Sequence, residues 1–286
     1  MIGIIIAIIS AMFMAAMQIL LKKSYKELDP SIAFFFDAIF GVLIWIPVGF
    51  IFGATIEGVL SCLIYAIISA VLSEALVFYA LSKGDLSVST VMIATYPIYT
   101  LLFSRYINKE ILSGEQLVFI ILTILGTILT CFDKNFKMKN LKNLTMLIPV
   151  IAAVAIGLSD TLTKKIINET SSFSFLVAIA IVQIPVALIY LKITKQKFSN
   201  IFDELKSGMK EYKYSIIGSL LNVLGTGCLL VSFNYGMVSI VSPLTAIYTP
   251  IVLVYSFIVL KEKMNKINFA GIISALIGTF GIIMLG

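Results

Sequence analysis

The chain contains no histidine, only three cysteines and, among 21 basic residues, a single arginine. Without histidine it lacks the commonest general base and the commonest metal ligand. Cys62, Cys131 and Cys228 lie far apart in apolar stretches, with neither metal-binding nor redox-motif spacing. No glycine-rich phosphate-binding loop of the Walker type is present, so the sequence predicts no ATP coupling within the chain. From these absences we expect no enzyme, no cofactor and no metal site.

Charge is also scarce. Charged residues make up 13% of the 286 residues and hydrophobic residues 60%. Soluble domains contain about 25% charged and about 45–50% apolar residues. The mean hydropathy is +1.07. This apolar surplus must face lipid, so the sequence predicts an all-α integral membrane protein. The net charge of +6 does not require a nucleic-acid partner, because the distribution of lysines explains it.

Ten apolar runs are long enough to cross a bilayer, which takes about 20 residues of helix. They fall at about 2–21, 32–52, 59–81, 87–104, 116–132, 144–162, 174–191, 214–232, 240–260 and 268–285. The short connections leave no room for a soluble domain. The longest connection, 192–213, is rich in lysine and predicts an interfacial helix.

Seventeen of the 21 basic residues lie in the connections after the odd-numbered spans. The positive-inside rule therefore places those connections in the cytoplasm and both termini outside. The first span starts almost at Met1 without a basic leader, which argues against a cleaved signal peptide. The preference for lysine and isoleucine suggests a bacterial protein of the inner membrane.

The two halves of the chain carry matching landmarks. Pro97 is followed by Glu110 and Gly126, and Pro250 by Glu262 and Gly278, in the same order and nearly the same spacing. Weaker matches are Lys22-Lys23 with Lys164-Lys165 and Ile46-Pro47 with Ile184-Pro185. The sequence therefore predicts repeats at 1–133 and 144–286, joined by a linker at 134–143. Because each repeat has five spans, the second must be inverted, a construction typical of secondary transporters.

A proline within a span, a loop glutamate and a glycine in the last span, once per half, resemble the EamA family of the drug/metabolite transporter superfamily. The resemblance covers essentially the whole chain. It implies a ten-helix bundle whose central cavity is lined mainly by spans 1, 3, 4, 6, 8 and 9. It leaves the substrate open, because relatives carry amino acids, sugars, nucleotide sugars, amines and drugs. The halves differ in that only the first has a basic residue, Arg105, before its loop lysine.

Three acids lie within the predicted spans: Asp37, Glu74 and Asp160. Such residues are costly in lipid and suggest function. Glu74 lies roughly 10 Å from the span end at about 1.5 Å per residue. Its role is that of a counter-charge for a cation, a proton-binding site or a structural hydrogen-bond acceptor. Asp37 lies near a helix start, where the dipole also favours it. Asp160 precedes Lys164 by four residues, which predicts an ion pair near the membrane surface.

Several aromatic and polar residues complete the candidate site. Tyr79 follows Glu74 on one span, and Trp45 follows Asp37 on another. An acid together with aromatic rings suits an ammonium group, which the rings attract by cation–π interaction. Around the predicted hinges Pro97 and Pro250 lie Tyr96, Tyr99 and Tyr248, as cavity-lining or packing residues. Asn222, Gln18 and Gln183 are candidates for hydrogen bonds between helices or to substrate.

Three further charged residues lie near span ends. We interpret Glu110 and Glu262 as helix-capping or loop-tying groups. Arg105 is either an anion gate or an interface anchor.

The sequence thus predicts a secondary transporter that moves a small polar metabolite by alternating access. An amino acid, amine or choline-like compound is favoured; a sugar, nucleotide-type or multidrug substrate is the main alternative, and a channel or membrane-embedded enzyme a remote one. The expected partners are the lipid bilayer and the small-molecule substrate, with a proton or a second substrate in antiport. A monomer and a homodimer are both compatible with a fused two-half carrier.

Overall fold

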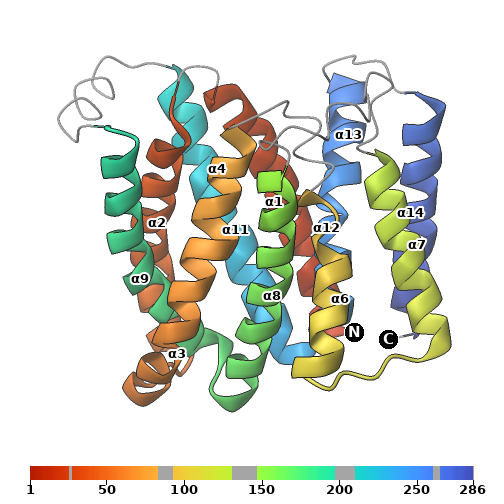
Figure 1. The fold of residues 1–286 in the computed structure, drawn as a ribbon, viewed down its shortest axis with the longest axis horizontal. Coiled ribbons are helices and arrows are strands. Elements are labelled where there is room, and N and C mark those ends of the chain that lie inside the picture. The colour runs from red at the N-terminus through yellow and green to blue at the C-terminus, as the bar shows by residue number, and fades with distance from the viewer. Residues whose placement is uncertain (26–27, 83–92, 131–146, 197–209, 260–264, 286) are drawn as a thin grey trace.

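The computed structural model describes residues 1–25, 28–82, 93–130, 147–196, 210–259 and 265–285, which are almost entirely helical (Figure 1). In the first half the helices are α1 (Ile2–Ser24), α2 (Pro30–Ile51), α3 (Ile56–Ile68), the π-helix η1 (Ser69–Ala75), α4 (Leu76–Ser82), α6 (Tyr96–Ile107) and α7 (Gly114–Thr130). In the second half they are α8 (Leu147–Glu169), α9 (Ser172–Ile193), α11 (Lys210–Tyr235), α12 (Val238–Ala246), α13 (Tyr248–Val259) and α14 (Lys266–Leu285).

Two helix starts show why the chain turns where it does. Asp29 caps α2 by accepting a hydrogen bond from the Ser31 amide at 2.9 Å, and Pro30 occupies the first helical position. Ser171 caps α9 by accepting from the Ser174 amide at 3.0 Å. These polar caps separate apolar helices across very short connections, so the chain reverses its direction between consecutive helices.

Within the described residues, seven helical segments are long and apolar enough to cross a membrane, and α7 is a shorter apolar helix. The predicted span 59–81 is one continuous segment formed by α3, η1 and α4. The predicted span 240–260 is instead broken at Ile247 into α12 and α13. Of the predicted span 87–104 the structure describes a turn at residues 94–95 and α6. The linker 134–143, most of the predicted interfacial helix and Glu262 lie outside the described residues.

Both prolines predicted as hinges lie near the start of a helix and not in its middle. Pro97 is in the first turn of α6 and Pro250 in the first turn of α13. Proline is tolerated there because the first amides of a helix have no partner within it. The chain is therefore interrupted just before each proline, which places two helix breaks inside the bundle.

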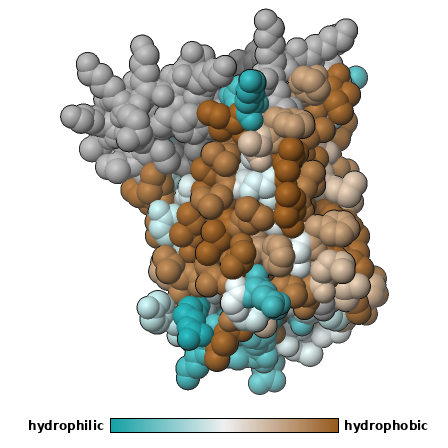
Figure 2. All heavy atoms as spheres, turned by 90° about the vertical axis from the view of Figure 1, so that its right-hand side faces the viewer, coloured by the Kyte–Doolittle hydropathy of each residue, from teal (hydrophilic) through white to brown (hydrophobic). Residues whose placement is uncertain are grey.

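The outer surface is apolar, as expected for lipid contact. Exposed large hydrophobic side chains occur on almost every long helix; examples are Leu43, Ile64, Leu102, Leu188 and Phe280. Figure 2 shows this apolar belt on one side of the bundle, above hydrophilic residues at its lower edge. Many polar side chains are instead buried between helices; Ser10, Ser219 and Asn222, for example, donate hydrogen bonds to the backbone or to another side chain. The chain is thus a multi-pass membrane protein.

Helices distant in sequence pack side by side. Both termini lie at one end of the bundle, called the terminal face below (Figure 1). α1 lies along α11, where the Ser10 hydroxyl donates to the Gly225 carbonyl at 2.7 Å. α2 lies against α9 and α11, and α6 against α8 and α12. The two halves therefore share one interior.

Glycines allow α7 and α14 to approach closely. A methyl group on Gly126 would lie 2.3 Å from the Ala275 backbone nitrogen and 2.7 Å from the Gly271 carbonyl oxygen. Backbone atoms cannot move aside as a flexible side chain can. We therefore expect Gly126→Val to lower the free energy of unfolding by at least about 2 kcal/mol and to depress the thermal midpoint in detergent. Leu125→Val, on the exposed side of the same helix, should change it little; equal midpoints would contradict this close contact.

Candidate substrate-binding site

Two buried carboxyl groups from different helices share one amide donor. The Gln183 side-chain nitrogen on α9 donates to Glu74 of η1 and, at 3.5 Å, to Oδ2 of Asp37 on α2. The Asn222 side-chain nitrogen on α11 donates to Oδ1 of Asp37 at 2.9 Å. These four residues, called the acid-pair cluster below, join four segments of both halves. In the described part of the chain, the hydrogen-bond donors to the two carboxyls are amides and not ammonium or guanidinium groups.

The position of Glu74 depends on a local irregularity in its helix. The π-helical turn Ser69–Ala75 closes with the Leu76 amide donating to the Val71 carbonyl, five residues back. Such wide turns inside a helix occur frequently at functional sites. Glu74 is buried, with an exposed fraction of 9%. In a continuous α-helix the same residue would point at a different angle around the helix axis. The π-turn is therefore part of what directs this carboxyl toward Gln183.

One face of α2 positions Asp37 against α11. The Ser219 hydroxyl donates to the Ala33 carbonyl at 2.7 Å, one turn before Asp37, and the Trp45 indole donates to the Val223 carbonyl at 3.2 Å, two turns after it. Gly41 lies on the same face of α2, one turn after Asp37 and one turn before Trp45. A methyl group there would be 2.9 Å from the Gln183 side-chain oxygen, so the absent side chain leaves room for the bridging amide.

Three aromatic rings lie next to the acid-pair cluster, on the side away from the terminal face. Phe34 is three residues before Asp37, Phe78 four residues after Glu74, and Tyr190 seven residues after Gln183. The Phe34 and Phe78 rings meet edge-on with centroids 5.3 Å apart, and the Phe34 and Tyr190 centroids are 6.1 Å apart. These three rings, the aromatic trio, belong to one packed cluster. They separate the two carboxyls from that end of the bundle.

Buried polar atoms near these groups lack hydrogen-bond partners among the described residues. They are the side-chain oxygen of Gln183 and the hydroxyl oxygens of Tyr25 and Tyr190. Tyr25 is close enough to Asp37 and Tyr190 to interact electrostatically with both. Buried polar atoms are usually hydrogen-bonded. Unused acceptors and hydroxyls beside two carboxyls are therefore a reason to look for a polar ligand here.

A third buried acid lies apart from this cluster. Asp160 of α8 accepts a hydrogen bond from the Ser242 hydroxyl of α12 at 2.8 Å. The hydroxyl of Tyr96, on α6, donates to the Ser242 carbonyl at 2.9 Å. The predicted ion pair with Lys164 is wrong: Lys164 is buried, and its ammonium donates to the Phe233 carbonyl of α11. The contacts of α8 with α11 and α12 turn the two side chains to different partners.

Glu110 joins the two halves near the terminal face. Its carboxylate accepts from the Val238 amide at 2.9 Å, from the Ser239 amide at 3.0 Å and from the Ser239 hydroxyl. It therefore caps the start of α12, as a capping role predicts, but on a helix of the other half. Arg105 donates to the Glu110 carbonyl at 3.3 Å and so supports this loop.

The remaining candidate residues lie outside the acid-pair cluster. Tyr79 is 38% exposed on α4. Trp45 is fully packed and bonded to α11. Tyr99 contacts α8 at Gly157, where an added methyl would lie 2.6 Å from the Tyr99 Cβ. Tyr248 lies next to Tyr96 at the break before α13.

Sequence reasoning weighted Gln183 too lightly and did not single out Phe34, Phe78 or Tyr190. Gln183 carries a signal, because it is the one amide within the apolar run 174–191. The aromatic trio carries none, since its rings resemble the other aromatic residues of the spans. Only the packing of three helices shows that they lie beside the acids.

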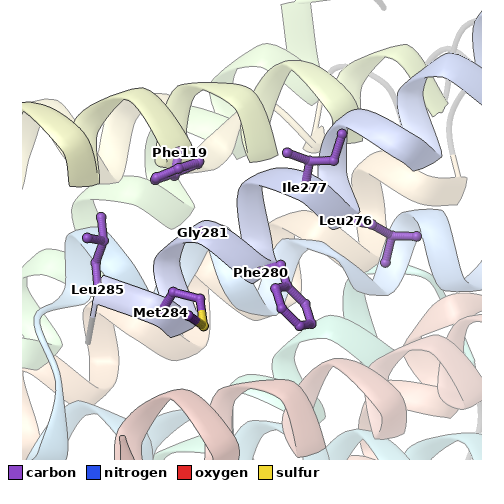
Figure 3. A pocket seen from close by; sticks show the side chains of 7 residues that line it. All are labelled: Phe119, Leu276, Ile277, Phe280, Gly281, Met284 and Leu285. Carbon is purple, nitrogen blue, oxygen red and sulfur yellow. The ribbon is translucent and has the colours of Figure 1, made fainter.

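An apolar groove on the outside of the bundle is a poor candidate by comparison. Figure 3 shows Phe119 of α7 facing a row of α14 side chains that includes Ile277, Phe280 and Met284. The groove offers no charged or hydrogen-bonding side chain. It lies within the apolar belt, so lipid chains suit it better than a polar solute.

Comparisons with known proteins agree with this architecture. A solved structure titled "Crystal structure of protein" aligns with a TM-score of 0.77 over 99% of this chain and 97% of its own, at 10% identity, which speaks for a shared fold alone. A comparison with curated proteins finds no match. The model of the EamA-like transporter family matches residues 1–132 and again residues 143–284. These two matches cover nearly the whole chain as two repeats, and the chain therefore belongs to the EamA-like transporter family of the drug/metabolite transporter superfamily.

Proposed function

We propose that this transporter binds a small organic compound that carries an ammonium group, an amine, amino acid or choline-like compound, at the acid-pair cluster. The observation that carries the proposal is the pair of buried carboxyls whose described donors are the amides of Gln183 and Asn222. Two acids in lipid surroundings without a basic partner need a cation or protons to offset their charge. The aromatic trio supplies rings near these acids, and an aromatic ring attracts an ammonium group.

We further propose that the chain crosses the membrane ten times as two inverted five-helix repeats. Two observations support this. α1 leads away from the terminal face whereas its counterpart α8 leads toward it, and both termini lie at the same end (Figure 1). The lysine-rich connections follow the odd-numbered spans, which places them in the cytoplasm and the terminal face outside. In a bacterial cell the membrane would be the cytoplasmic one.

Alternating access follows from this arrangement. The acid-pair cluster takes residues from α2, η1, α9 and α11, so rearrangement of one half against the other changes the side from which it is reached. Exchange of the cation for a proton keeps the site charge nearly constant through the cycle. A substrate without an ammonium group would leave the two carboxyls without compensation.

Ligand-induced stabilisation of the purified protein tests the substrate class. The panel is choline, ethanolamine and putrescine as amines, alanine and lysine as amino acids, glucose, and UMP. A ligand at about 100 times its dissociation constant stabilises the folded state by about 2.7 kcal/mol. We expect the thermal midpoint to rise with one or more amines or amino acids. Stabilisation by glucose or UMP alone would contradict the proposed substrate class and leave the transporter family unaffected.

A further inference from the structure

Asp160 is a buried carboxyl that the proposed cation site does not use. It is 7% exposed, lies on α8, and the donor to it within the described residues is the Ser242 hydroxyl of α12. Lys164, one turn along the same helix, directs its ammonium to the Phe233 carbonyl instead. Glu74, whose π-turn also packs on α8, is bound by Gln183. Asp160 therefore needs another way to offset its charge.

In the described part of the chain, the titratable side chains that other helices place beside Asp160 are tyrosines. Tyr96 faces it from α6, and Tyr248 of α13 lies next to Tyr96. α12 contributes the hydroxyl of Ser242, whose carbonyl accepts from the Tyr96 hydroxyl. None of these side chains supplies a positive charge. A proton on Asp160 itself is then the simplest compensation.

The place of Asp160 in the fold points to a ligand. Tyr96 is the first residue of α6, directly after the turn at residues 94–95, and α12 ends at Ala246 before the break at Ile247. Interrupted helices inside transporters place substrates and coupling ions, because unpaired backbone groups collect at the breaks. Asp160 thus lies where two broken helices, one from each half, meet α8.

The partner of Asp160 suits a carboxyl that changes its protonation state. A serine hydroxyl can donate to a carboxylate and, after rotation, accept from a carboxylic acid. The amide nitrogens that reach Asp37 can only donate, and they occupy both of its oxygens. These donors therefore favour the charged form of Asp37, whereas the Ser242 hydroxyl can pair with either form of Asp160.

We infer that Asp160 is a second proton-binding site, which couples transport to the proton gradient while the acid-pair cluster holds the substrate. The inference rests on the proposed function. In each cycle Asp160 takes up one proton from one side and releases the same proton to the other. Its neutral and charged forms favour different packing of α8 against α6 and α12.

Transport in proteoliposomes separates this role from a structural one, with radiolabelled choline as the probe. In Asp160→Asn we expect choline exchange at equal pH on both sides to stay within about twofold of wild type. Accumulation driven by a pH gradient should fall at least tenfold. Asp160→Glu, which keeps a proton-binding group, should recover part of it, and Glu57→Gln, an exposed acid on α3, should behave as wild type.

Other transport results would overturn the inference. Loss of exchange together with driven accumulation in a folded Asp160→Asn protein would show a structural residue. Retention of both, or accumulation driven by sodium at fixed pH, would show that protons do not couple through Asp160. If Asp160→Asn does not fold, Ser242→Ala takes its place. Loss of that donor should keep Asp160 protonated to higher pH and move the pH profile of driven transport to the alkaline side; an unmoved profile contradicts the role.

Infrared titration of the protein in lipid nanodiscs tests the site without any substrate. Wild type should show a protonated-carboxyl stretch with a component that is missing in Asp160→Asn and retained in Glu74→Gln. An identical titration in wild type and Asp160→Asn would overturn the inference even if amines are transported. If the band behaves as expected but no amine or amino acid binds, the proposed substrate class fails and the proton site stands.

Discussion

Glu74→Gln is expected to weaken amine binding about 10- to 150-fold, the equivalent of about 1.5–3 kcal/mol for a hydrogen bond to a charged group. The substitution keeps the volume and shape of the side chain and removes its charge. The amide of Gln183 can still donate to the new side-chain oxygen, so the packing of η1 against α9 should persist. The loss should therefore appear in ligand affinity and choline uptake and not in the thermal midpoint.

The pH dependence of binding gives a second measure of the same residue. Protons neutralise the acid pair, so amine affinity in wild type should fall as the pH is lowered. In Glu74→Gln one of the two competing groups is gone, and the profile should be flatter. Scintillation-proximity binding of radiolabelled choline across a pH series measures both quantities.

Glu57→Gln is the matched control, since Glu57 starts the same continuous helical segment and is exposed. It removes the same charge from the same helix at a distance from the cluster. Wild-type affinity with an unchanged pH profile in Glu74→Gln would remove Glu74 from the site. A similar loss in both variants would indicate a non-specific effect of net charge.

The broad architecture was predictable because it depends on composition and periodicity. A helix that crosses lipid must be long and apolar, so such spans and their polar connections are visible in the sequence. The two matching sets of landmarks predicted a repeat, and the family model matches twice. The burial of Glu74 and Asp37 was likewise suggested by their rarity in apolar surroundings.

The partners of those acids were not predictable, because they depend on how helices rotate against one another. A straight α-helix from Ile56 to Ser82 would not direct Glu74 as the π-turn does. The spacing of Asp160 and Lys164 favours an ion pair within one helix, but contacts to α11 and α12 override it. Local spacing says which pairs are possible, and only tertiary packing decides among them.

The second large effect is expected for Glu110→Gln, which should loosen the terminal face. A carboxylate offers two acceptor oxygens, and here one accepts from the Val238 amide and the other from the Ser239 amide and hydroxyl. A glutamine offers one oxygen and one NH₂ group, so one set of donors must meet another donor. The variant thereby loses at least one charge-assisted hydrogen bond at the start of α12.

The turn that carries Glu110 makes this contact specific. α6 ends at Ile107, Lys109 then adopts the left-handed region at φ 55°, and the Glu110 amide donates back to the Ser104 carbonyl at 3.3 Å. This reversal directs the carboxylate toward α12. Because α6 and α12 belong to different halves, the proposed alternating-access cycle requires them to separate here when the site opens to the terminal face. Weakening the cap should therefore raise the population of the state open at that face.

Two measurements check this prediction. Hydrogen exchange of the segment 238–246 should speed up at least about tenfold, in line with the loss of about 1.5 kcal/mol. A cysteine placed at Thr245, which is buried deeper on α12, should react faster with a membrane-impermeant maleimide in a background without the native cysteines. The second measurement distinguishes opening of the face from fraying of the first turn of α12.

Glu115→Gln provides the control, because Glu115 is an exposed acid in the first turn of α7 and follows Glu110 in the chain by five residues. Its loss changes the charge of the same face without touching α12. Faster exchange in both variants would assign the effect to surface charge. Faster exchange without faster labelling at residue 245 would limit Glu110 to capping one helix, whereas an increase in both in Glu110→Gln alone would identify the carboxylate as the contact that keeps this face closed.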